Sequence, residues 1–78
     1  FDYIELTPEV AIYEVAVPES WYGKSIIEKS IRTKYHISIL ATKEGGKIYP
    51  LPQPDHVFQA KETLMVMGGH DDIKKLTQ

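Results

Sequence analysis

Side chains alternate between two faces along two stretches of the chain, and a third stretch is strongly apolar, which predicts three core β-strands. These stretches are EVAIYEVAVP at 9–18, ISILATK at 37–43 and TLMVMGG at 63–69. The segment DYIELTP, 2–8, precedes the first of them and fits a strand, a short turn or the end of a helix. The side chains predicted to share a face are Ala11, Tyr13, Val15 and Val17 in the first strand, and Ile37, Ile39 and Ala41 in the second.

A second periodicity, of about 100° per residue, predicts a helix over 26–35. Ser25 and Glu28 match the capping box S-x-x-E, in which each side chain accepts a hydrogen bond from an otherwise unpaired backbone N–H. Only one stripe of this helix can pack on the domain's own sheet, so the Ile26 side is expected to meet another protein surface. His36 follows at the position where glycine is the usual left-handed cap. The stripe predicted to enter the core is Ile27, Ile31 and Tyr35, and the other is Ile26, Ser30 and Thr33.

The remaining segments predict a hairpin, a loop and a second helix. A turn at 44–46, Glu-Gly-Gly, leads into KIYPLP at 47–52, whose prolines favour a short edge strand. The loop-like segment 53–62 carries Val57 and Phe58, which we expect to anchor it in the core. The last segment, HDDIKKLTQ, places aspartates before lysines, which is the charge order that a helix dipole favours.

These elements predict a single α+β domain of order roughly β-α-β-β-β-α, with a small, mostly antiparallel sheet and two helices. Ferredoxin-like and ACT-like domains have similar element counts. A domain of 78 residues buries only about 60% of the surface that its unfolded chain exposes, so its core is small. Association with a second copy is one remedy, and we expect a two-fold homodimer.

Composition and charge narrow the possible functions. The chain has no cysteine, which excludes disulfides and thiolate metal sites and fits a cytoplasmic protein. No apolar run approaches the roughly 20 residues that span a bilayer. A formal net charge of −2 gives no broad field for a nucleic acid polymer or an anionic membrane. Any bound anion must therefore be held by a local basic group.

The sequence shows no recognisable catalytic or metal-binding pattern. His36, His56 and His70 form no ligand spacing with one another, so surface or loop positions are favoured for them. No nucleophile is paired with a base, and no phosphate-binding glycine motif occurs. We therefore expect a chain with no enzymatic activity, no cofactor and no metal.

Arg32 is the only arginine in the chain and lies among the apolar residues of the predicted helix. One interpretation is a solvated or salt-bridged side chain. The other is an anion-binding group, because the planar guanidinium fork suits phosphate oxygens beside an apolar wall. Periodicity alone favours neither.

The ordered set GKSIIEKSIRTKY, ISILATK, YPLPQPD, TLMVMGG and HDDIKKL resembles the RCK C-terminal domain, also called TrkA-C, over nearly the whole chain. Within that family it is most similar to the KtrA branch, the gating subunits of bacterial potassium uptake channels. The resemblance implies that 1–78 is one such domain from a longer chain with a Rossmann-type domain before it. It further implies a cytoplasmic protein, held at the inner face of the membrane by its transporter partner.

The same resemblance implies a ligand, cyclic di-AMP, bound at the interface of a two-fold dimer to control potassium transport. Carried over by position, its binding residues are Ile26, Ile27, Ser30, Ile31, Arg32, Ser38, Ile39 and Pro54. Ser30 stands where the family carries an aspartate, and Ser38 where it carries an asparagine. The competing functions are an ACT-like module that binds an amino acid or another small metabolite, and a dimerisation module without a ligand.

Overall fold

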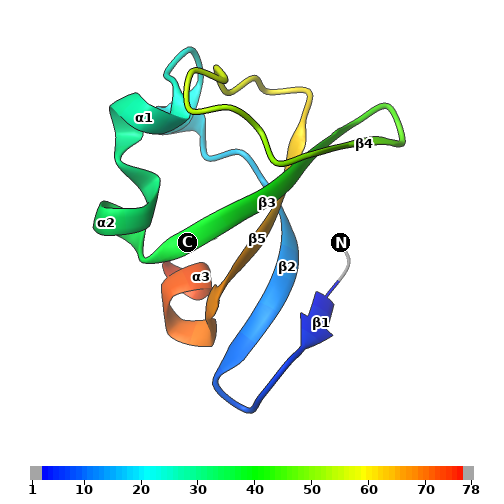
Figure 1. The fold of residues 1–78 in the computed structure, drawn as a ribbon, viewed down its shortest axis with the longest axis vertical. Coiled ribbons are helices and arrows are strands. Elements are labelled where there is room, and N and C mark those ends of the chain that lie inside the picture. Colours follow the sequence, from blue (N-terminus) through cyan, green and yellow to red (C-terminus); the bar gives the residue numbers. More distant parts are fainter. Residues whose placement is uncertain (1–2, 77–78) are drawn as a thin grey trace.

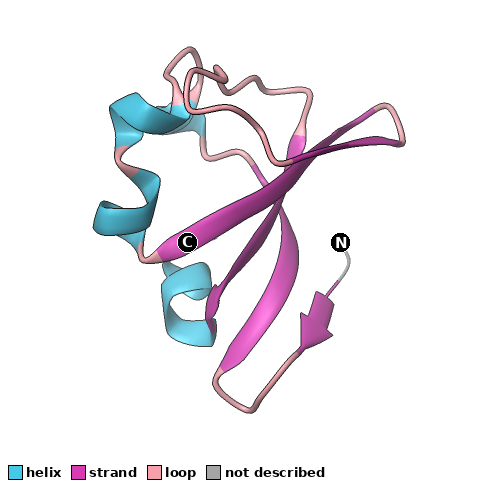
Figure 2. Cartoon of the chain, viewed as in Figure 1, coloured by secondary structure: helices cyan, strands magenta, loops and turns pink. Residues whose placement is uncertain are grey.

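The structure, a computed structural model, describes residues 3–76 and contains one antiparallel sheet with helices on one side of it (Figures 1 and 2). The sheet has five strands in the order β1-β2-β5-β3-β4. Figure 1 shows α1 and α2 beside β3, and α3 against the ends of β2 and β5. The strands are β1 (Tyr3–Glu5), β2 (Val10–Ala16), β3 (Ile37–Glu44), β4 (Lys47–Pro50) and β5 (Thr63–Gly69), and the helices are the 3-10 turn η1 (Glu19–Trp21), α1 (Ile26–Lys29), α2 (Ile31–Tyr35) and α3 (His70–Leu76).

The predicted fold class, element order and antiparallel sheet are confirmed. The segment at the start of the chain, which the sequence left open between a strand, a turn and the end of a helix, contains the edge strand β1. β5 is the central strand, and its side chains Leu64 and Val66 are fully buried. Directly paired residues lie on the same face of a sheet, so Val15 and Tyr13, which pair with them from β2, share the core face as predicted. The other members of the core include Trp21, Ile31, Ile37, Phe58 and Ile73.

The alternation predicted for β3 fails after Ile39. A register shift between Ile39 and Ala41 leaves Leu40 without a direct partner on β5. Such a bulge adds one residue to a strand and reverses the faces that follow it. Ala41 therefore pairs with Met65 on the face away from the helices, and Thr42 takes the buried position opposite Leu64.

The predicted single helix is broken in two at Ser30. The capping box is confirmed: the Glu28 backbone N–H donates to Ser25 Oγ at 3.1 Å, and the Ser25 N–H donates to Glu28 Oε1 at 3.1 Å. Ser30, however, adopts a left-handed conformation with φ 49° and ψ 51°, which ends α1 before α2 begins. His36, with φ 60°, then ends α2 in the left-handed cap expected of that position.

This break corrects the assignment of the isoleucines. A left-handed residue interrupts the helical periodicity, so one stripe cannot run from Ile27 through Ile31. Ile27 is 68% exposed, whereas Ile26, predicted to meet a partner, packs partly against the core. Ile31 is buried and Tyr35 packs against Trp21 with ring centroids 5.0 Å apart, as predicted.

The connecting segments follow their turn residues. Gly45 and Gly46, with φ 58° and 80°, form a two-residue hairpin turn between β3 and the edge strand β4. Phe58 enters the core as expected, but Val57 does not and remains exposed. Asp2, Thr77 and Gln78, which belong to the predicted terminal segments, lie outside the described residues. No helix within 3–76 is both long enough and apolar enough to cross a membrane.

We predict that Gly68→Ala destabilises the fold by about 1–3 kcal/mol, which is typical of overpacking. A Cβ at this position would lie 2.9 Å from Ile37 Cγ2 and 3.3 Å from the backbone oxygen of His36. Urea denaturation is the measurement, and Gly69→Ala is the matched control, since its closest contact would be 3.4 Å, to Asp72 Oδ2. Equal losses in the two variants would contradict the close approach at Gly68.

Candidate functional site

The candidate site is a small pocket where α1 and α2 meet the beginning of β3. β4 pairs with β3 only over 41–44, so the outer edge of 37–39 has no neighbouring strand within the described chain. Beyond residue 39 this edge is occupied by Leu51, whose N–H donates a hydrogen bond to the Leu40 carbonyl at 2.8 Å. The pocket of about 190 Å³ is lined by Ile26, Ile31, Arg32, Ile37, Ser38, Ile39, Pro52 and Pro54.

The wall opposite the helices is residues 51–58, which we call the proline loop. The carbonyl of Pro54 accepts a hydrogen bond from the Ile27 N–H at 2.9 Å, and the carbonyl of His56 accepts one from the Ile26 N–H at 3.0 Å. Two further bonds join the segment before α1 to the end of the loop: the Phe58 N–H donates to Lys24 O at 2.9 Å, and the Gly23 N–H to Phe58 O at 2.9 Å. The loop is therefore held to α1 by the backbone rather than by side-chain packing alone.

Most of the residues predicted from the sequence come together here. Ile26, Ile31, Arg32, Ser38, Ile39 and Pro54 line the pocket, while Ile27 and Ser30 do not. Ile27 points away because of the break at Ser30, and Ser30 is itself the exposed residue of that break. Ile37 and Pro52 were not predicted. Both could have been found, since Ile37 precedes Ser38 on the same strand and Pro52 lies in the same proline-rich segment as Pro54.

Arg32 is the charged group of the pocket. It is exposed, and no carboxylate within 3–76 forms an ion pair with its guanidinium. Lys29 and Lys34 lie over the Tyr35 ring, with Nζ at 5.8 and 5.6 Å from its centroid. Burial opposes ionisation of the Tyr35 phenol, yet hydrogen bonding to Lys29 and Trp21 and the lysine charges lower the pKa of Tyr35 below its usual value. This part of an acidic chain is therefore locally positive.

The pocket can hold an anion beside a flat apolar group. Its hydrophobic wall is formed by isoleucines and prolines. Ser38 is half-buried, and its hydroxyl has no hydrogen-bond partner in the part of the chain that is described. Ligand pockets commonly measure about 300–1,000 Å³. At about 190 Å³ this one is too small to enclose a nucleotide, so a ligand of that size would need walls from elsewhere.

A larger cavity of about 730 Å³ lies along β2 and η1, and Tyr3 and Leu76, the first and last described residues, both line it. Its charged lining groups are the carboxylates Glu14 and Glu19. It therefore provides no basic group for an anion.

The histidines are placed apart from one another. His56 contacts Glu62, and His70 Nδ1 lies 3.1 Å from the Tyr13 hydroxyl. Across 3–76 no group of three histidine, aspartate or glutamate side chains could hold a metal ion. The absence of a metal and the absence of catalysis stay predictions.

The comparisons with known proteins agree with the fold. The TrkA-C domain family matches residues 10–78. Two proteins of Bacillus subtilis (strain 168) are similar over 95% of the chain: the Ktr system potassium uptake protein A, at 36% identity, and the Ktr system potassium uptake protein C, at 31%. The chain spans about one third of the length of each of these curated relatives.

Two solved structures with a bound nucleotide resemble the chain. The RCK C domain of the potassium transport protein KtrA in complex with cyclic di-AMP matches with a TM-score of 0.75 and 31% identity, covering 82% of this chain and 75% of that one. The RCK_C domain dimer of Streptococcus agalactiae BusR in complex with cyclic di-AMP matches with a TM-score of 0.68 and 26% identity, covering 85% and 88%. The match to the family covers most of the chain, and the fold of the chain agrees with that of the solved RCK C domains. The chain therefore belongs to the TrkA-C family, whose members are also called RCK C domains.

Proposed function

We propose that this chain is the regulatory ligand-binding domain of a potassium-transport gating subunit and that it binds cyclic di-AMP between two copies of itself. The observation that carries the proposal is the pocket of α1, α2, β3 and the proline loop, which combines an isoleucine and proline wall with Arg32, a side chain that forms no ion pair within 3–76. Relatives that are named as potassium uptake proteins, and RCK C domains solved with cyclic di-AMP, support it.

The ligand and the pocket are matched in chemistry. Cyclic di-AMP has two equivalent phosphates and two flat, largely apolar adenines. A two-fold dimer presents two copies of Arg32 and two apolar walls, so one arginine per chain can face each phosphate. The small volume of a single pocket also favours a shared site, because one protomer supplies only half of the surface that such a ligand needs.

Exposed apolar side chains on α1 and on the proline loop, the two elements that border the pocket, are the proposed dimer contact. Ile27 on α1 is 68% exposed and Leu51 at the start of the proline loop is 75% exposed. Exposed apolar groups gathered beside a pocket are typical of an interface. Ile27, which does not line the pocket, is thereby reassigned from ligand contact to subunit contact.

In the full protein we propose that a Rossmann-type domain precedes this one. The whole would then act in the cytoplasm, at the inner face of the membrane, on a potassium channel or transporter subunit. Ligand binding at the dimer interface would alter the relative position of two such domains and thereby the state of that partner.

Arg32→Ala is predicted to weaken cyclic di-AMP binding by more than about a hundredfold. Each charge-assisted hydrogen bond contributes roughly 1.5–3 kcal/mol, two are lost per dimer, and about 1.4 kcal/mol corresponds to a tenfold change in affinity. Calorimetry with the wild type should give one ligand per two chains. Lys34→Ala is the control, since Lys34 lies over Tyr35 and does not line the pocket.

Full affinity in Arg32→Ala, or one ligand per chain, would refute this site. Binding of an amino acid in place of the dinucleotide would favour an ACT-like module. Dimerisation with neither ligand would favour a purely structural role.

Ile27→Glu is expected to weaken the dimer in sedimentation experiments while leaving the free energy of unfolding nearly unchanged, because Ile27 lies outside the core. Ile26→Glu should instead destabilise the fold, since Ile26 packs against the core cluster. The matched control is Ile48→Glu on β4, at an isoleucine that is 55% exposed and away from the pocket. A greater loss of dimer in Ile48→Glu would move the interface to the hairpin.

We predict that the protein returns cyclic di-AMP unchanged after prolonged incubation, because no nucleophile and base are recognisably paired in its sequence. Chromatography of the incubated ligand is the measurement, with the Arg32→Ala protein as control. A linear or mononucleotide product that requires Arg32 would show that the domain is an enzyme.

A further inference from the structure

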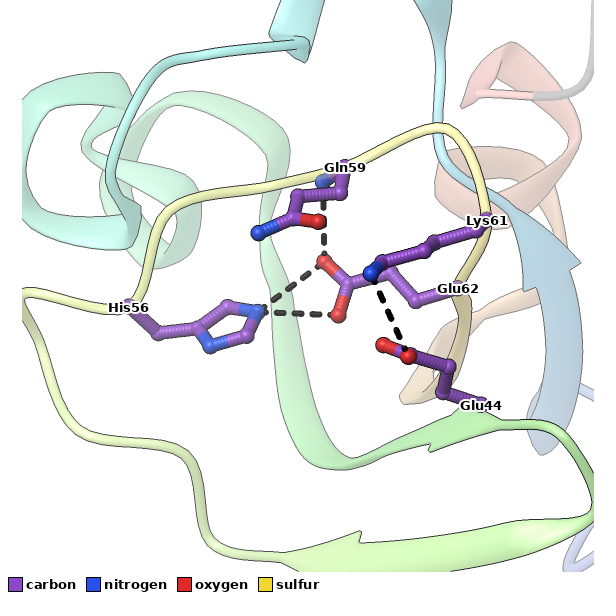
Figure 3. Close-up of polar contacts among 5 residues, drawn as sticks. All are labelled: Glu44, His56, Gln59, Lys61 and Glu62. Carbon is purple, nitrogen blue, oxygen red and sulfur yellow. Dashed lines mark hydrogen bonds and ion pairs between the residues drawn. The ribbon is translucent and has the colours of Figure 1, made fainter.

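A buried carboxylate lies directly beneath the proline loop. Glu62 is only 4% exposed and immediately precedes β5. Its Oε1 and Oε2 lie 2.9 and 3.0 Å from His56 Nε2, and Oε1 also accepts a hydrogen bond from the Gln59 backbone N–H at 3.1 Å (Figure 3). A carboxylate acts only as an acceptor, so His56 is the donor. A buried carboxylate without such donors would be strongly unfavourable.

His56 connects this carboxylate to both the core and α1. Its ring packs edge-on against Phe58, with centroids 6.0 Å apart and an interplanar angle of 82°. Its backbone carbonyl accepts from the Ile26 N–H, and its own N–H donates to the Gln53 carbonyl at 2.9 Å. The residue whose side chain is held by Glu62 is therefore also the residue whose carbonyl binds the first turn of α1.

Between Leu51 and Phe58, the described part of the proline loop has few other attachments. Pro52 and Pro54 have no N–H to donate. In the described structure, no backbone N–H of 52–56 donates to a group outside the loop. The ends of the loop are fixed by the Leu51 and Phe58 N–H bonds and by the buried Phe58 ring. Between these ends, the position of the wall depends on its carbonyl contacts to α1 and on the side-chain contact of His56.

We propose that His56 and Glu62 are a positioning pair for the pocket. Their contact holds the loop wall that carries Pro52 and Pro54 at a set distance from the α1 wall that carries Ile26. Neither His56 nor Glu62 lines the pocket, so they act through the loop and not on the ligand. The expected effect of this pair on ligand affinity rests on the proposed function, whereas its effect on the position of the loop does not.

The neighbouring ion pair between Lys61 and Glu44 provides a matched control. Lys61 Nζ lies 3.5 Å from Glu44 Oε2, both side chains are largely exposed, and the pair joins the segment before β5 to β3 (Figure 3). Exposed pairs of this kind contribute little to stability. Lys61→Met thus removes a polar contact one residue from Glu62 without touching the loop.

The experiment compares wild type, His56→Leu, His56→Gln and Lys61→Met without ligand, by amide hydrogen exchange. His56→Leu should accelerate exchange of the Ile26 and Ile27 amides by about tenfold or more, the change expected when a hydrogen bond to a buried acceptor is lost. Exchange of the Leu64 and Val66 amides in β5 should change less. His56→Gln keeps an N–H donor and should restore slow exchange in part, and Lys61→Met should match the wild type.

The second arm measures cyclic di-AMP affinity in the same variants. We expect the affinity to fall in His56→Leu, to recover in part in His56→Gln and to stay unchanged in Lys61→Met. Unchanged exchange at Ile26 and Ile27 in His56→Leu, or equal acceleration at β5, would overturn the positioning role. If the wild type binds no cyclic di-AMP, the proposed function fails, and the exchange arm still decides whether the pair holds the loop.

If an unpaired buried carboxylate keeps His56→Leu from folding, the double variant His56→Leu/Glu62→Leu replaces it, since it leaves no charge unpaired. Faster exchange confined to Ile26 and Ile27 in that variant supports the pair. Wild-type exchange there refutes it.

Discussion

Backbone hydrogen bonds between residues 23–27 and 54–58 are the interaction on which the candidate site depends. They join the start of α1 to the proline loop, two segments about thirty residues apart in the chain. They also place Phe58 in the core between these segments, where its ring contacts Trp21 at 5.0 Å. Without this connection, Ile26 and Pro54 would belong to separate surfaces and would form no pocket.

The left-handed residues Ser30 and His36 shape the same region by interrupting the helix. A left-handed conformation costs a non-glycine residue about 1–2 kcal/mol, and both positions lie within the segment that forms the pocket. Because of the first break, Ile27 faces solvent, while Ile26 and Ile31 face inward. A continuous helix of ten residues could not expose one of these isoleucines and bury its neighbours in this way. Backbone strain of this kind is often found at functional sites.

Electrostatics gives the pocket a preference that the net charge does not predict. The chain carries a formal charge of −2, yet residues 29–34 contain three basic side chains and no acidic one. Two buried carboxylates, Glu14 and Glu62, have partners away from the pocket. Glu14 contacts Lys43 and Thr63, and Glu62 contacts His56. Arg32 forms no ion pair with any described residue, so its guanidinium can face an anion from outside the chain.

Much of the fold followed from local sequence signals, whereas most of the candidate site followed from the resemblance to the family. Strand alternation, the Ser25–Glu28 capping box and the paired glycines at 45–46 are interactions between near neighbours, so the sequence alone determined these elements. The family pattern added the pocket residues that the structure gathers, with Arg32 among them. The sequence also determined that no thiolate chemistry is possible, because the chain has no cysteine.

Tertiary structure decided the features that depend on contacts between distant segments. The bulge at Leu40 arises from the register between β3 and β5. It placed Ala41, which is still buried, on the opposite face of the sheet and Thr42 on the face of Leu64. The break at Ser30 reversed the roles of Ile26 and Ile27, because packing on the sheet outweighs the weak helical preference of a ten-residue segment. The link between His56 and Glu62 spans six residues and requires a burial that no periodicity encodes. Local patterns specify which elements form, but the energies of register and burial are set only when those elements pack together.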